Sequence, residues 1–406
     1  MLGHMQRFKF DNVTKVTLVY FCTRFHFYIH AYALILIQRG LSLLQISAIE
    51  SLVILITFFA DTPTGILADR LGRKWSILLG VAFLASGETL FLFSKVYPLY
   101  LVVAVLTGLG FAFSSGATDA LIYDSLPVEG RAEAMKRVMG RYNSAGQIAF
   151  FLSPIIGGLL LDDLAPERVS LAIIFTVTSL VIGILISLTL HEPPTAWHSE
   201  RQSIRTIVGD GWNELRSNRL LRRVVLLAIF SAPFTGPLIT TLAPPYLVQN
   251  GVPTFWVGLA LSLGSLMAAF TQANVYRLER WIGERGALLL ATLLPGAFYL
   301  LLSQLTGALP VWLLITLMYG TNDLRAPLLS AHENVLISGG SRATVLSMIN
   351  TASSLFIAVM EPVYAALATH SLPLAFVTIG SVIGIAALVF RLPKREQTPV
   401  IVENLS

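Results

Sequence analysis

Residues 60–74 read ADTPTGILADRLGRK and place a burst of charge at the end of a long apolar run. Asp61 lies inside the run itself, and four further charged residues follow within 69–74. Charge is costly inside a hydrocarbon layer and is retained there mainly for function. This stretch therefore raises two questions, namely what surrounds it and what its charges do.

The composition around this stretch is that of a membrane protein. The chain has 406 residues, of which 55% are hydrophobic and 13% are charged, and its mean hydropathy is +0.72. A soluble domain carries about 25% charged residues. Apolar runs near 20 residues long recur along the chain, and a continuous run of this length predicts a membrane-spanning helix rather than a barrel strand. We predict an all-α membrane protein.

The hydropathy pattern predicts twelve spans. Their ranges are 15–37, 45–67, 75–94, 98–122, 138–160, 169–190, 224–248, 255–276, 286–305, 309–331, 343–368 and 373–391. The first run is long and polar for a signal peptide, so we expect it to be retained as a span. The expected domains are a six-helix bundle at 1–190, a linker at 191–223, a second six-helix bundle at 224–391 and a tail at 392–406. Apolar residues at helical spacing within the linker predict an amphipathic helix on the membrane surface, and a disordered tether is the alternative.

Basic residues favour one orientation of these spans. Of the 28 Lys and Arg residues, 23 fall in segments on the side of the two termini, three in the opposite loops and two within spans. The positive-inside rule then places both termini in the cytoplasm, for a multi-pass protein of the plasma (inner) membrane. The excess positive charge is expected to face anionic lipid and not nucleic acid. The single cysteine, Cys22, excludes an internal disulfide and a cysteine-based metal cluster.

A spaced set of glycines and charges ends the second predicted span: Gly65, Asp69, Arg70, Gly72, Arg73 and Lys74. This pattern resembles the loop between the second and third helices of the major facilitator superfamily (MFS). The resemblance implies the MFS fold, with two pseudo-symmetric six-helix bundles. In that family the aspartate meets the start of the eleventh helix, here Ser341 to Thr344 with Arg342, and the arginine pairs with an acid ending the fourth, here Asp124.

Physical chemistry gives these residue types a role as a cytoplasmic gate. Gly65 permits close helix packing and Gly72 a turn with positive φ. A cluster that fastens one half to the other on one face favours the state closed on that face. The alternative is that the basic residues only enforce topology. A degenerate second copy is predicted at 281–285, with Glu333 in the position of Asp124.

Four acids within or near the spans are candidates for proton coupling: Asp61, Asp119, Glu88 and Glu361. Buried carboxyl groups can bind and release protons near neutral pH. Asp61 has equally good alternative roles, as a permanent partner of a basic residue such as Arg24 or as part of the gate. We expect Glu88 and Glu361 to lie toward the outer ends of their spans, within reach of water.

Six residues are candidates for substrate binding: Arg24, His26, Tyr28, His30, Asp323 and Arg325. His26 and His30 are four residues apart, on one face of a continuous helix, and are also suited to proton transfer. Two histidines without a third ligand predict no metal site. The aromatic residues around them suit a planar or amphiphilic molecule, although lipid-facing aromatics are a common alternative.

The fifth span contains Pro154, Gly157 and Gly158 in the pattern Pro-x-x-Gly-Gly. This pattern resembles the fifth-helix motif of the drug/proton antiporters in the superfamily. Ser153 and Ala149 stand where those exporters have glycines, and the fourth span lacks their arginine. The departures put the usual proton-relay scheme in doubt and leave a close-packing surface with a helix bend as the structural expectation.

The sequence thus predicts a secondary transporter that moves a small organic molecule by alternating access, with proton-coupled efflux as the preferred form. Alternatives are proton-coupled uptake of a sugar, organic anion or peptide-like solute, and a ligand sensor that does not transport. No motif of hydrolases, intramembrane proteases or ATP-binding loops occurs, so we predict neither an enzyme nor a cofactor. The expected partners are the substrate, a proton or other coupling ion and the lipid bilayer, with the chain as a monomer.

Overall fold

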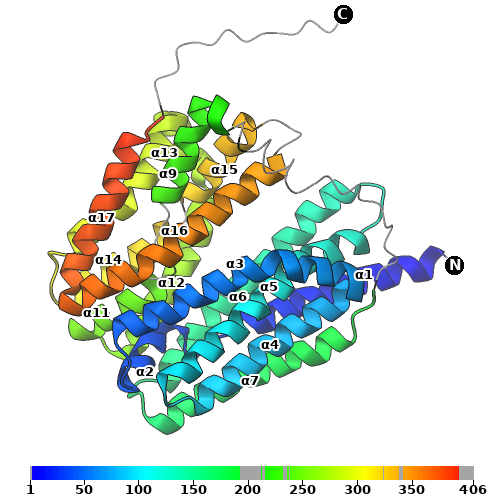
Figure 1. Cartoon of the computed structure of the whole chain (residues 1–406), viewed down its shortest axis with the longest axis horizontal. Coiled ribbons are helices and arrows are strands. Elements are labelled where there is room, and N and C mark those ends of the chain that lie inside the picture. The colour runs from blue at the N-terminus through cyan, green and yellow to red at the C-terminus, as the bar shows by residue number, and fades with distance from the viewer. Residues whose placement is uncertain are drawn as a thin grey trace, which may run out of the picture.

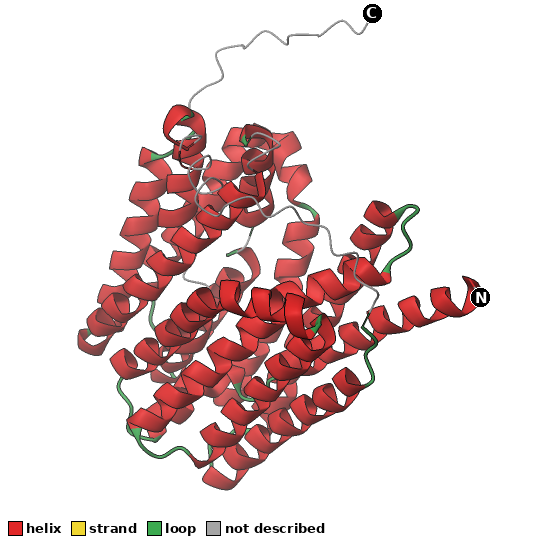
Figure 2. Cartoon of the chain, turned by 45° about the vertical axis from the view of Figure 1, so that its right-hand side comes forward, coloured by secondary structure: helices red, strands yellow, loops and turns green. Residues whose placement is uncertain are grey.

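The computed structural model describes an all-helical protein (Figures 1 and 2). The described residues are 2–192, 212, 215–231, 236, 238–322, 324–337 and 342–392. Within these residues the secondary structure contains helices and no strands, as the hydropathy pattern predicts.

The first half of the chain forms one bundle. Its elements are α1 (Leu2–Arg24), η1 (Ile29–Ala31), α2 (Tyr32–Gln38), α3 (Leu43–Leu71), α4 (Arg73–Phe93), α5 (Tyr97–Ser125), α6 (Arg131–Leu160) and α7 (Pro166–Leu188). α3 begins at a capping box, in which the Ser42 side chain accepts from the backbone N–H of Gln45 and the Gln45 side chain returns a bond to Ser42. It ends at Gly72, whose φ of 100° suits only glycine.

The second half forms the other bundle. Its elements are α9 (Arg219–Phe230), η2 (Leu238–Leu242), α11 (Ala243–Gln249), α12 (Thr254–Ala273), α13 (Val275–Leu302), α14 (Ala308–Thr321), α15 (Arg325–Leu336), α16 (Arg342–His370) and α17 (Leu372–Val389). Each bundle has its own apolar clusters, and residues such as Ile29 and Phe150 of the first half pack against the cluster of the second.

Within the described residues, nine helices are long and apolar enough to cross a membrane. The remaining three predicted spans are interrupted in the structure. The span predicted at 15–37 divides into α1, η1 and α2, the span at 224–248 into α9, η2 and α11, and the span at 309–331 into α14 and α15. The twelve predicted crossings are consistent with this arrangement.

The first interruption has a visible cause. After α1 ends at Arg24, the backbone N–H of Phe27 donates to Thr176 Oγ1 of α7 at 3.3 Å. The carbonyl oxygen of Phe27 lies against Gly157 of α6, where a side chain would collide with it. Backbone groups that leave a helix inside a membrane need such partners within the protein.

The two bundles meet at one end and separate toward the other. α2 contacts α11, η1 contacts α12, α3 packs along α16, and α6 packs along α12. Figure 1 shows α2 and α11 together at one end, whereas the halves diverge toward the side of the two termini. We call these the closed end and the terminus side. The predicted linker helix falls mostly on residues 193–211, outside the described part of the chain.

Candidate functional site

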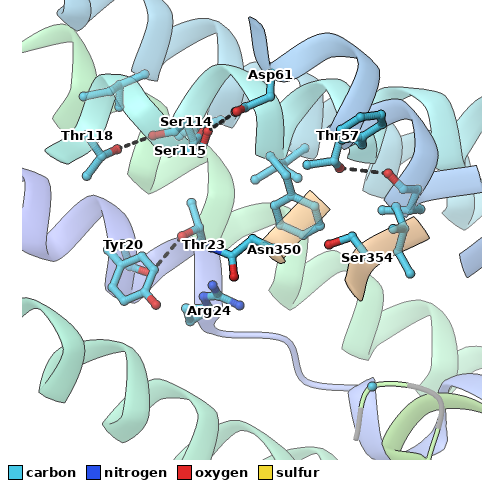
Figure 3. Close-up of a pocket in the computed structure, with 18 of the residues that line it drawn as sticks. Tyr20, Thr23, Arg24, Thr57, Asp61, Ser114, Ser115, Thr118, Asn350 and Ser354 are labelled. Carbon is cyan, nitrogen blue, oxygen red and sulfur yellow. Dashed lines mark hydrogen bonds between the residues drawn. The ribbon is translucent and has the colours of Figure 1, made fainter. Parts of the chain in front are cut away.

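A cavity of about 1040 Å³ lies between the two bundles (Figure 3). The first half lines it with side chains from α1, α3, α4, α5 and α6, and the second half with side chains mainly from α16. Because one wall belongs to each half, a change in the angle between the halves changes the access to the cavity. This is the arrangement expected of a carrier whose site lies between two repeats.

The charged residues that line this cavity are mostly acidic. They are Glu50 and Asp61 of α3, Glu361 of α16 and a single cation, Arg24, at the end of α1. Asp61 accepts a hydrogen bond from Ser115 Oγ of α5 at 2.7 Å, drawn in Figure 3. Arg24 lies over the ring of Tyr20, 5.1 Å from its centroid. Asp61 therefore has its partner in its own half, and the partner is a hydroxyl group.

Two carboxyl groups from opposite halves, Glu50 and Glu361, line the same cavity and interact electrostatically. Glu50 lies near the start of α3 and Glu361 near the end of α16, so both are on the closed-end part of their helices. Glu361 is 3% exposed and accepts a long hydrogen bond, 3.5 Å, from Thr241 Oγ1 of η2. The hydroxyl of Tyr32 in α2 interacts electrostatically with Glu50. The expectation of easy water access at Glu361 is wrong, because its side chain is buried at the seam between the halves.

A second polar cluster lies inside the first half, around the break after α1. The hydroxyl of Tyr28 donates to one carboxylate oxygen of Glu88 in α4, and His26 Nδ1 lies 3.6 Å from the other. The ring of Tyr28 stacks on the ring of Phe91, and the guanidinium carbon of Arg39 lies 4.9 Å from the centroid of the same ring. Tyr28, His26 and Glu88 are absent from the cavity lining. This cluster links α4 to the broken segment.

His30 occupies a different position from His26. Because α1 ends at Arg24, the two histidines do not share a helix face, so that prediction is wrong. His30 is fully buried, and neither of its ring nitrogens has a hydrogen-bond partner in the described structure. Its ring lies against Gly157 of α6 and Gly258 of α12, one from each half. His30 therefore fills the closed seam and does not line the cavity.

The motif residues of α6 lie at the same seam. Pro154 is inside α6, and its carbonyl oxygen lies against Gly258 of α12. Gly158 lies against the backbone of Phe255, where an added Cβ would meet the carbonyl oxygen at 3.2 Å. Side chains at these glycines would push the two halves apart.

On the terminus side, the loop at residues 65–74 is held by contacts within its own half. Arg73, at the start of α4, pairs with Asp124 at the end of α5 and donates from Nη1 to the carbonyl oxygen of Ala120 at 2.7 Å. Glu192, beyond α7, accepts hydrogen bonds from the backbone N–H groups of Arg73 and Lys74, both at 2.8 Å. Sequence reasoning missed Glu192, although an acid at a helix N-terminus is the general signal that could have suggested it.

Among the described residues, no hydrogen bond or ion pair joins Asp69 or Arg70 to the second half. Asp69 and Arg70 are exposed, and the side chains of Arg342 and its neighbours lie outside the described part. An added Cβ at Gly65 would have open space around it. Close packing at Gly65 is therefore not found here, because the halves are apart on this side.

The second half contains a corresponding turn with other chemistry. Gly283 interrupts α13 with a φ of 75°, and Glu284, the next residue, lies 3.2 Å from Nε2 of His332 in α15. The sequence places Glu333 in the position of Asp124. In the structure Glu333 is buried, and the neighbouring His332 pairs with the turn.

Three predicted residues lie away from the cavity lining or outside the described part. Arg325 is buried and donates to the carbonyl oxygen of Ala228 and to Ser231 Oγ, which joins α15 to α9. Asp119 is exposed near the end of α5. Asp323 lies outside the described residues.

Comparisons with known proteins identify similar proteins by sequence and by fold. The family model described as "Major Facilitator Superfamily" matches residues 16–359. Multidrug resistance protein 1 of Bacillus subtilis (strain 168) is 24% identical over 266 residues, and multidrug efflux pump Tap of Mycobacterium bovis (strain BCG / Pasteur 1173P2) is 26% identical over 259 residues. The matches span 65% and 60%, respectively, of both chains.

Among solved structures, the nucleoside transporter NupG superposes with a TM-score of 0.75 at 14% identity, covering 94% of this chain and 98% of its own. At this identity the likeness concerns the fold alone.

Proposed function

The chain belongs to the Major Facilitator Superfamily of transporters, and we propose that it exports a small organic cation in exchange for protons by alternating access. The observation that carries the proposal is the lining of the cavity between the halves, which combines three carboxyl groups with one guanidinium. In a site of low dielectric, such an excess of acid attracts positive charge strongly.

The aromatic rings of the lining favour the same class of substrate. Tyr20, Phe58, Phe111 and Tyr142 surround the acidic groups. Aromatic faces attract organic cations, and flat rings accept varied apolar shapes. An amphiphilic cation therefore fits this cavity better than a sugar or an organic anion.

The direction of transport is proposed from the charge pattern and from the relatives. The distribution of Lys and Arg supports cytoplasmic termini in the plasma (inner) membrane, so the cavity is open to the cytoplasm in the state described here. A carrier that loads from the cytoplasm is suited to export. Proteins named as a multidrug resistance protein and an efflux pump are consistent with that direction.

The loop at 65–74 is proposed as the gate on the cytoplasmic face. The Arg73–Asp124 pair holds the loop in shape within its own half, and Asp69 and Arg70 remain exposed. We expect Asp69 to reach the start of α16 near Arg342 when the halves close on this side. The linker at 191–223 would then have to accommodate the rocking of the two bundles.

Transport of tetraphenylphosphonium into everted membrane vesicles tests this proposal. In such vesicles the cytoplasmic face is outward, and an acidic lumen supplies the proton gradient. We expect the cation to accumulate in the lumen, with the membrane potential clamped by valinomycin and potassium. Tetraphenylborate, which has the same shape and the opposite charge, is the matched control and should not accumulate.

Three outcomes would contradict the proposal. Accumulation in the lumen driven by an acidic exterior would indicate symport of the cation with protons and not exchange. Accumulation of tetraphenylborate alone would reverse the charge preference. Binding of the cation without any flux would favour a ligand sensor.

A further inference from the structure

We propose that Glu50 and Glu361 hold the coupling proton jointly, and that this shared proton keeps the closed end of the molecule closed. The inference deepens the proposed function and rests on it, because it names the residues that exchange the proton for the cationic substrate. The sequence indicates Glu50 as a charge within a span and Glu361 as a candidate for proton coupling, but it does not predict that the two act together.

The geometry places these two groups on opposite halves. Glu50 belongs to α3 and Glu361 to α16, and these two helices pack against one another across the seam. Both side chains line the cavity, and they interact electrostatically. Any force between the two carboxyl groups therefore acts directly between the two bundles.

Among the described residues, no ion pair joins Glu50 or Glu361 to a cation. The ion pairs found among the described residues involve other acids, namely Glu88, Asp124, Glu133, Asp163 and Glu284. Glu50 interacts electrostatically with Tyr32, and Glu361 has the 3.5 Å contact with Thr241. Within the described part of the chain, the other charged or titratable groups of the cavity lining are Tyr20, Arg24, Asp61 and Tyr142, and Tyr32, beside the pair, also interacts with Glu88.

Two carboxylates in a buried site repel, whereas one proton between them converts repulsion into a hydrogen bond. Like charges at close range in low dielectric are strongly unfavourable, and such pairs titrate as a unit. With one proton, a carboxyl group of one half can donate to the carboxylate of the other, which stabilises the closed end. Without that proton, the two negative charges favour separation of α3 from α16.

The exchange of proton and substrate then follows with balanced charge. From the cytoplasm, an organic cation enters the open cavity, and the pair releases its proton to the water there. The pair, now doubly negative, holds the cation and favours the state open at the other end. After the cation leaves to the outside, a proton from that side rejoins the pair, and the closed end forms again.

A distance measurement without substrate tests the pair directly. Ile37 of α2 and Val248 of α11 are exposed and belong to elements that contact across the closed end. Spin labels at Ile37→Cys and Val248→Cys, in a Cys22→Ala background, report the separation of the halves there. We expect the distance to lengthen as pH rises in the parent protein, and this lengthening to be lost in Glu50→Gln and in Glu361→Gln.

Glu88→Gln is the comparison variant, because Glu88 is a buried acid of the same half with partners inside that half. It should retain the pH response. The proposal is overturned if the parent shows no response, if both Gln variants at the seam keep it, or if Glu88→Gln loses it as well.

Tyr32→Phe provides a second readout that does not depend on removing an acid. The Tyr32 hydroxyl is a donor that stabilises the charged form of Glu50, so its loss favours the protonated pair. The midpoint of the opening should then shift to higher pH, and an unchanged or lower midpoint would contradict the proposal. The distance between the spin labels is measured without substrate. If vesicle transport is absent while this distance still responds to pH, only the proposed function is refuted.

Discussion

The two halves contain the same backbone turn with different side chains around it. Gly72 has a φ of 100° between α3 and α4, and Gly283 has a φ of 75° within α13. The residue after the first turn is a cation, Arg73, which pairs with an acid. The residue after the second is an acid, Glu284, which pairs with a histidine.

The difference concerns how firmly each turn is held. The Arg73–Asp124 pair has side chains that are 20% and 23% exposed, and Glu192 caps the same helix start. Glu284 is 55% exposed, and its pair with His332 is ionic only when the imidazole is protonated. The two halves thus retain the same backbone turn but hold it differently. The pair at Arg73 joins two charged groups, whereas the pair at Glu284 is ionic only with a protonated imidazole.

The largest effect is expected from Arg73→Ala. Because this ion pair is partly buried, we expect a loss of about 1–3 kcal/mol, between the values for exposed and buried pairs. Transport should fall along with stability. The unfolding temperature can be followed with a thiol-reactive dye, since Cys22 is buried and is the only cysteine.

A double-mutant cycle with Asp124→Ala isolates the pair. The two substitutions together should cost clearly less than the sum of the single effects. Additive costs would show that the ion pair contributes nothing to stability. The two turns would then not differ in how firmly they are held.

An intermediate effect is expected from alanine at the two turn glycines. Both φ values lie in a region that strains other residues by about 1–3 kcal/mol. An added Cβ at Gly72 would also meet Glu192 Oε2 at 2.9 Å, whereas the space around Gly283 is open. Gly72→Ala should therefore lower the unfolding temperature more than Gly283→Ala.

Glu192→Ala sharpens this second test. Removal of the cap should itself cost about 0.5–2 kcal/mol. It should also reduce the difference between the two glycine variants, because the collision at position 72 disappears. An unchanged difference would mean that Glu192 is not its source.

The smallest effect is expected from His332→Gln. The Glu284 side chain is 55% exposed, and a solvent-exposed pair contributes about 0–1 kcal/mol. Unfolding temperatures of the parent and of His332→Gln measure it; a loss as large as that of Arg73→Ala would contradict the difference between the two turns.

The parts of the fold that follow from bilayer physics could be predicted from the sequence. Runs near 20 apolar residues indicate crossings, whatever the tertiary contacts, because hydrocarbon thickness sets their length. The pairing of Arg73 with Asp124 also agrees with the family resemblance, since both positions fall at helix ends on the same side of the membrane.

The interruptions and the acid pair could not be predicted in the same way. The break after Arg24 depends on Thr176 and Gly157, which come from helices far along the chain. The meeting of Glu50 with Glu361 depends on how α3 crosses α16. Neither carries a local pattern, because both arise from packing between distant segments.

The accessibility of the central cavity from each face of the membrane tests the account most directly. Asn350 of α16 lines the cavity and is labelled in Figure 3. In Asn350→Cys, with Cys22→Ala, an impermeant maleimide should react from the cytoplasmic face at acidic pH. Reaction from the outside should increase at alkaline pH, with a matching decrease from the cytoplasm. Reaction from both faces at once, or from the outside alone at every pH, would contradict the alternating cavity.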